Sequence, residues 1–124
     1  MNINKTLHLP LKAQWYNMIE SGIKPEEYRE IKAYWVQRLC IWPDGRKIGK
    51  SDAEFLASNI SCLISAIYEG GIEFTDSTRV KFSFGYTKRT MTYKIKDIVL
   101  GKGNPEWGAQ DKEVFIIKLG KRVA

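Results

Sequence analysis

The last third of the chain contains three short runs rich in β-branched and aromatic residues, and these constrain the fold most. They cover residues 79–84, 90–100 and 114–119, and their partial alternation of apolar and polar side chains predicts β-strands. Glycine-bearing loops at 85–89 and 101–111 separate them. A chain that ends in this way needs a sheet as part of its core.

The N-terminal part adds strands and a helix to this sheet. Leu7, Leu9 and Leu11 alternate along a predicted strand at 6–11, which we expect Pro10 to end. Residues 12–21 follow as a short amphipathic helix that stops at Gly22. A second strand is predicted at 26–30. The apolar stripe of the helix consists of Leu11, Trp15, Met18 and Ile19.

Two further helical segments are predicted in the middle of the chain. One is a helical turn at 33–39. The other is a single helix at 51–69, which Ser51 and Glu54 open as a capping box and which ends at two glycines. No strand is followed by a glycine-rich phosphate fingerprint, which argues against a Rossmann fold. The inward stripe of the 51–69 helix is expected to comprise Phe55, Leu56, Ile60, Leu63, Ile64 and Ile67.

This order of elements indicates one α+β domain over 1–124. Its strands are expected to curl into a small mixed β-barrel flanked by short helices. A chain of 124 residues can bury a stable core without staples. Cys40 and Cys62 make neither a disulfide framework nor a zinc motif, and we expect reduced, partly buried thiols in the cytoplasm. The N-terminal segment lacks the apolar run of a signal peptide, and no stretch predicts a membrane span.

Charge is segregated along the chain. The net charge is +6, which suits a phosphate-bearing partner. Residues 51–78 carry five acidic groups and no basic group, whereas residues 79–102 carry seven basic groups and one acidic group. Separation of this kind indicates a binding face within 79–102.

Lys24, Glu27 and Arg29 form the most informative cluster of charged residues. On a strand at 26–30, Glu27 and Arg29 share one face, and Lys24 in the preceding turn can lie beside Glu27. Arginine and lysine hold phosphates or carbonyls, and a glutamate accepts hydrogen bonds from the amino edge of a base. The residue types alone favour a solvated charged strand with ordinary ion pairs.

Three motifs in order resemble the ASCH domain, a member of the PUA-like superfamily, in its compact bacterial and phage form. The resemblance covers nearly the whole chain except residues 51–70, which look like a helical insertion. The second motif is Phe84-Gly85-Tyr86 and the third runs from Gly101 to Ala109. The first motif is Trp15-x-x-Met18-Ile19-x-Ser21-Gly22-x-Lys24-x-x-Glu27-Tyr28-Arg29.

The resemblance implies a PUA-type β-barrel with a cleft beside the first helix. Family members are thought to bind RNA there, so it implies an RNA- or nucleotide-binding module in which Lys24, Glu27 and Arg29 line the cleft. Some relatives look like amidohydrolases that act on acylated cytidine, which makes a small hydrolase an alternative with Lys24, Glu27 and Glu106 as its catalytic residues. The threonine of that chemistry is replaced by Glu27, which favours a binding protein over an enzyme.

Further candidate binding residues lie in the C-terminal loops. Tyr86 could stack on a base while Lys88 and Arg89 hold phosphates, although a hairpin turn with solvated charges explains them equally well. Trp107 is either a lid over the cleft or a plug under the barrel. No cofactor or metal is expected. A third possibility is a protein-interaction module that docks a partner on the acidic helix at 51–69.

Overall fold

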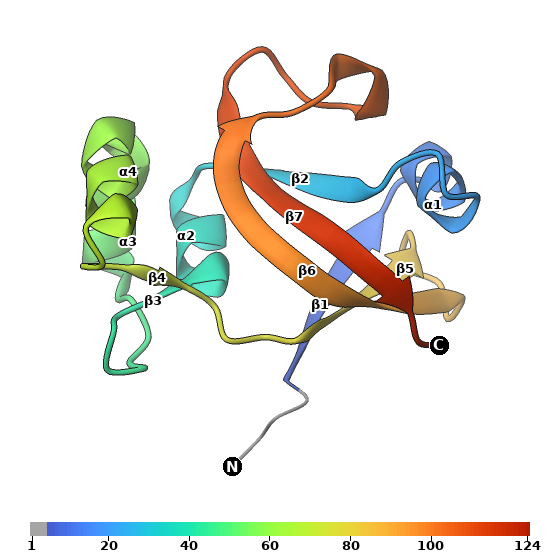
Figure 1. The fold of residues 1–124 in the computed structure, drawn as a ribbon, viewed down its shortest axis with the longest axis horizontal. Coiled ribbons are helices and arrows are strands. Elements are labelled where there is room, and N and C mark those ends of the chain that lie inside the picture. The colour runs from blue at the N-terminus through green and yellow to red at the C-terminus, as the bar shows by residue number, and fades with distance from the viewer. Residues whose placement is uncertain (1–4) are drawn as a thin grey trace. The chain divides into compact units, whose positions relative to one another are not determined.

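The computed structural model describes residues 5–124 and divides the chain into two compact units (Figure 1). The first combines the residues up to Tyr28 with Asp76–Ala124, and the second is Arg29–Thr75. The expected helical insertion lies inside the second unit. The expectation of no signal peptide concerns the N-terminal segment. Residues 1–4 of that segment lie outside the described residues.

The first unit is built on a five-stranded mixed sheet. Its strand order is β1 (Thr6–Leu11), β5 (Arg79–Phe84), β6 (Thr90–Lys102), β7 (Glu113–Arg122) and β2 (Glu26–Glu30). The β1 and β5 strands are parallel, while β5–β6 and β6–β7 are antiparallel. The expected α+β class and the curled mixed sheet are confirmed, and β6 and β7 are longer than predicted.

The long β6 strand curves strongly across the unit (Figure 1). Its pairing with β7 shifts register between Tyr93 and Asp97. An irregularity of this kind bends a strand and increases its twist. The curl of the sheet therefore has a local cause in β6.

The predicted bounds of the first strand and its alternation are confirmed, but the expectation that Pro10 ends it is wrong. Leu7, Leu9 and Leu11 are buried, and β1 continues past Pro10 to Leu11. Since β1 lies at the edge of the sheet, the missing amide hydrogen of Pro10 does not interrupt a central ladder.

The predicted first helix is confirmed as α1 (Ala13–Glu20). Its two buried residues are Tyr16 and Ile19. The predicted burial of Ile19 is confirmed, Trp15 and Met18 are only half-buried, and Tyr16 was not predicted to face the core. Gly22 has a φ of 85°, the left-handed conformation expected of a helix stop.

The second unit contains three helices and a two-stranded antiparallel sheet. The helices are α2 (Ala33–Leu39), α3 (Lys50–Ser58) and α4 (Ile60–Tyr68), and the strands are β3 (Cys40–Ile41) and β4 (Glu73–Phe74). The prediction of a helical turn at 33–39 is confirmed. In the described part of the chain, no helix is both long and apolar enough to cross a membrane.

The prediction of one helix at 51–69 is wrong, as is its capping box. The α3 and α4 helices are separated at Asn59, whose φ and ψ are −131° and 69°, and the Asn59 side-chain Nδ2 donates to the Phe55 carbonyl. Gly49 caps α3, and its carbonyl accepts from the Ala53 amide. Ser51 therefore lies inside the first turn, where it cannot act as the N-cap.

The two cysteines are free thiols in different environments. Cys40 is buried and Cys62 is exposed, so the expectation of two partly buried thiols is wrong for Cys62. Burial raises the pKa of the Cys40 thiol to about 12.

Candidate nucleic-acid interface

Lys24 and Glu27 form a buried ion pair. The turn at Pro25 leads into β2, and the Lys24 Nζ lies 3.0 Å from the Glu27 Oε1. Only 1% of the Lys24 side chain and 8% of the Glu27 side chain are exposed. The predicted proximity of these two residues is confirmed. Their burial means that neither charge faces solvent in this structure.

Aromatic rings and a carbonyl complete the surroundings of the Lys24 ammonium. It lies 4.4 Å from the centroid of the Tyr28 ring and 5.5 Å from that of Trp15. It also donates to the Trp107 carbonyl at 2.9 Å. Carboxylate, carbonyl and ring faces together replace the water that a buried ammonium loses.

Residues 103–109 cover this ion pair and pack closely against Tyr28 and Trp15. The Tyr28 hydroxyl accepts from the Asn104 amide at 3.0 Å and donates to Glu26 at 2.6 Å. Burial and the hydrogen bond to Glu26 raise the pKa of Tyr28. A Cβ on Gly103 would lie 2.5 Å from the Tyr28 ring, and one on Gly108 would lie 2.7 Å from Trp15. Glycine is thus required at both contacts by close packing.

The other residues proposed around Lys24 have different neighbours. Trp107 belongs to the short 3₁₀ helix η1 (Pro105–Trp107) and contacts Lys24 through its carbonyl. Glu106 makes no ion pair with any residue between 5 and 124, so the structure does not bring it to Lys24. Arg29 begins the second unit, where its guanidinium lies 4.8 Å from the Trp35 ring. Its place in the cluster stays a prediction.

Three cations occupy neighbouring positions on the outward face of β5 and β6. Arg79 pairs with Lys94, and Lys81 pairs with Thr92. Directly opposed residues have Cβ atoms about 5 Å apart and diagonal ones about 7–8 Å apart, so the three charges form one cluster. Within residues 5–124 none of the three makes an ion pair. We call Arg79, Lys81 and Lys94 the strand cations.

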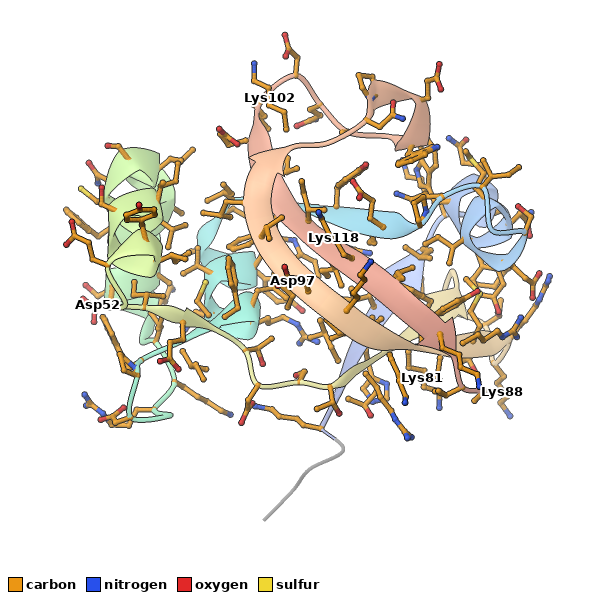
Figure 2. All side chains as sticks on the ribbon, in the orientation of Figure 1. Asp52, Lys81, Lys88, Asp97, Lys102 and Lys118 are labelled. Atoms are coloured by element: carbon orange, nitrogen blue, oxygen red, sulfur yellow. The ribbon has the colours of Figure 1, made fainter. Side chains whose placement is uncertain are left out.

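The hairpin that joins β5 to β6 presents an aromatic ring beside further positive charge. Tyr86 is 98% exposed, and Lys88 is exposed two residues later. The turn is held by the Thr87 hydroxyl, which donates to the Phe84 carbonyl, and by the Ser83 hydroxyl, which donates to the Gly85 carbonyl. Figure 2 labels Lys88 here and Lys81 on β5. Tyr86 is therefore presented to solvent by an ordered turn.

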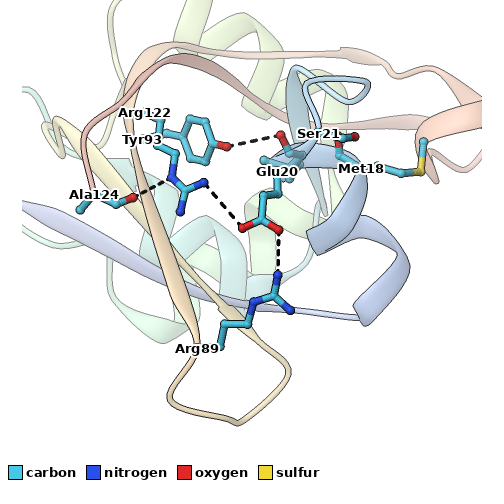
Figure 3. Close-up of polar contacts among 8 residues, drawn as sticks. Met18, Glu20, Ser21, Arg89, Tyr93, Arg122 and Ala124 are labelled. Carbon is cyan, nitrogen blue, oxygen red and sulfur yellow. Dashed lines mark hydrogen bonds and ion pairs between the residues drawn. The ribbon is translucent and has the colours of Figure 1, made fainter.

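Arg89 differs from Lys88 because it has an acidic partner. Its guanidinium lies 2.7 Å from Glu20 of α1 (Figure 3). It also lies 5.0 Å from the centroid of the Tyr16 ring and 5.1 Å from that of Phe84. Glu20 also lies 3.6 Å from Arg122 of β7. One carboxylate thus links α1 to the hairpin and to the last strand.

In the sequence, the strand cations stand out only as members of the basic segment 79–102. Their shared face follows from the spacing of two between Arg79 and Lys81, which alternation along a strand could have indicated. Lys94 lies opposite Arg79 because of the register in which β5 and β6 pair. No pattern within either strand alone predicts that register. The sequence also did not indicate which residues surround Lys24, namely Trp15, Tyr28, Gly103 and Gly108.

No group of metal-ligating side chains occurs in the described part of the chain. Comparison of the sequence with protein-family models and with curated proteins, and of the chain with solved structures, found no match.

Proposed function

We propose that the chain is a PUA-like module that binds single-stranded RNA on the outward face of β5 and β6 and at the adjoining hairpin. The observation that carries the proposal is the cluster of strand cations, which make no ion pair with any residue from 5 to 124. The two strands that carry them are joined by the hairpin with the exposed Tyr86 and Lys88. The resemblance to the ASCH domain supports the same class of ligand.

The proposed contacts divide into two kinds. Arg79, Lys81, Lys94 and Lys88 hold backbone phosphates, which contribute affinity without reading sequence. Tyr86 offers a ring face on which an unpaired base stacks, and every base has such a face. An exposed aromatic beside cations suits a single strand better than a duplex, whose bases are already stacked.

Lys24 and Glu27 have a supporting role in this proposal. Both are buried and engaged with each other, and segment 103–109 covers them. A base or an acylated nucleoside could reach them only after that segment moved. The same burial weakens the case for a hydrolase that uses Lys24 as its base, because a proton acceptor must reach its substrate.

The test is a titration with fluorescein-labelled single-stranded RNA, duplex RNA and single-stranded DNA at several salt concentrations. Four phosphate contacts predict a slope of about −3 for log K against log salt, since each contact on a single strand contributes about −0.7. Replacing the strand cations by glutamine should remove about two units of that slope. An unchanged slope would overturn the proposal.

The stacking contact has a matched control in the second unit. Tyr86→Ala should weaken RNA binding by roughly 5- to 150-fold, because stacking on one aromatic contributes about 1–3 kcal/mol. Tyr68→Ala removes a tyrosine of similar exposure, 91%, from α4 and should leave RNA affinity unchanged. Equal losses in the two variants would show that Tyr86 has no specific contact. Preference for duplex RNA would contradict the single-strand assignment.

A further inference from the structure

We propose that α4 is a docking surface for a basic amphipathic helix of a partner protein. The surface is the stripe Ile60, Ile64, Ile67 and Tyr68, which we call the α4 stripe. It belongs to the second unit and is independent of the proposed RNA-binding face. The occupant is identified by its chemistry, a helix with leucine-like side chains on one face and lysine or arginine on the other.

The α4 stripe is apolar, with Ile64 and Tyr68 exposed and Ile60 and Ile67 half-buried. The helix has the sequence ISCLISAIY, without a charged residue, yet Leu63 is its only buried side chain. Ile64 is 39% exposed and Tyr68 is 91% exposed, so the prediction that Ile64 points inward is wrong. A helix that is apolar on most sides is normally buried all round. Exposed apolar surface of this extent marks a site of interaction.

The stripe has the spacing that a partner helix requires. Ile60, Ile64 and Tyr68 stand at i, i+4 and i+8, which places them along one side of α4. Such rows are the ridges that pack into the grooves of a second helix. Tyr68 at the exposed end supplies a ring and a hydroxyl, a combination that is enriched at interface centres.

The end of α4 is well anchored, so the exposure of Tyr68 does not come from a frayed terminus. The Gly71 amide donates to the Ala66 carbonyl at 2.8 Å, and the Glu69 amide donates to the Ser65 carbonyl at 2.9 Å. Gly70 has a φ of 83°, and the following Ile72 is buried. This arrangement satisfies the last carbonyls of the helix and secures it to the core.

Charge selects the kind of partner. The acidic residues on α3 and after α4 are exposed and make no ion pair within residues 5–124, and no basic residue occurs from 51 to 78. A second copy of this chain would bring two sets of these carboxylates together, which like-charge repulsion disfavours. A basic helix would be attracted to them. The residues concerned are Asp52, Glu54, Glu69 and Glu73.

The experiment uses three fluorescein-labelled 18-residue probes and the full chain. The first is an amphipathic leucine–lysine helix, the second an amphipathic leucine–glutamate helix, and the third a leucine–lysine peptide of the same composition without amphipathic spacing. We expect saturable binding of the first probe only, measured by anisotropy. Because the whole chain carries a net charge of +6, non-specific attraction would favour the glutamate probe.

Variants assign the binding to α4. The pair Ile64→Ser and Tyr68→Ser should weaken binding of the lysine probe at least tenfold, and Glu54→Gln with Glu69→Gln should weaken it about threefold and reduce its salt dependence. Circular dichroism verifies that each variant is folded. Tyr86→Ser removes the comparably exposed tyrosine of the hairpin and should bind the probe as the parent does.

Three outcomes would overturn the proposal. The first is equal binding of the lysine and glutamate probes, and the second is unchanged binding by the folded double-serine variant. The third is a dimer in sedimentation velocity that Tyr68→Ser dissociates, since it would make a second copy the occupant of the α4 stripe. Each readout is separate from RNA binding, which the substitutions at Glu54, Ile64, Tyr68 and Glu69 should leave intact.

Discussion

Two glutamates of the first unit make ion pairs in opposite settings. Glu27 is buried with Lys24 at 3.0 Å, whereas Glu20 lies at the surface with Arg89 at 2.7 Å and Arg122 at 3.6 Å. The exposed pair is the shorter one. Distance alone would make the exposed pair the stronger one. Water and mobile ions screen the attraction in the exposed pair, whereas the buried pair is shielded from both.

The comparison teaches that burial decides what each pair contributes. The Lys24–Glu27 pair is almost completely shielded from water, so removing one partner takes away an attraction that water cannot replace. Glu20, with about a third of its side chain exposed, can return to water when its partners are removed. The following substitutions test this difference, from the largest expected effect to the smallest.

Lys24→Met should lower the free energy of unfolding by about 3–5 kcal/mol, because it removes the ammonium that lies 3.0 Å from the buried Glu27 carboxylate. Urea unfolding followed by tryptophan fluorescence measures the change. The control is Lys24→Met combined with Glu27→Leu, which removes both charges and should recover most of the loss. If the single and double variants unfold at the same urea concentration, the pair is not the source of the effect.

Gly108→Ala should lower the free energy of unfolding by about 2–4 kcal/mol. Its φ of 96° is unfavourable for alanine, and the new Cβ would lie 2.7 Å from Trp15 beside Lys24. Gly85→Ala is the matched control, because Gly85 also has a positive φ of 58° but has no atom within 4 Å of an added Cβ. Thermal unfolding should show a smaller loss for Gly85→Ala. Equal losses would mean that the close packing of segment 103–109 against Trp15 does not contribute to stability.

Glu20→Gln should change the free energy of unfolding by no more than about 1 kcal/mol, and the difference should shrink further at high salt. Parallel urea titrations of variant and parent at low and high sodium chloride concentrations measure it. A loss as large as that of Lys24→Met would remove the distinction between the two pairs.

Local patterns in the sequence predicted most of the elements and part of the site. Alternation located β1 and β5, and the spacing from Lys24 across Pro25 to Glu27 predicted their proximity. The same reasoning failed between Ser51 and Glu69, where helix propensity is continuous on both sides of Asn59. A single residue with non-helical φ and ψ divides that segment, and its side chain donates to the Phe55 carbonyl four residues earlier.

The sequence by itself determined the identity of the charged groups, their order along the chain and the faces on which alternation places them. The tertiary structure alone decided which of them remain in water. Lys24 is buried because Trp107, 83 residues later, returns to cover it, and Lys94 lies opposite Arg79 because of the register between β5 and β6. Burial and register depend on segments that are distant in sequence, and the energy of a charge depends on both.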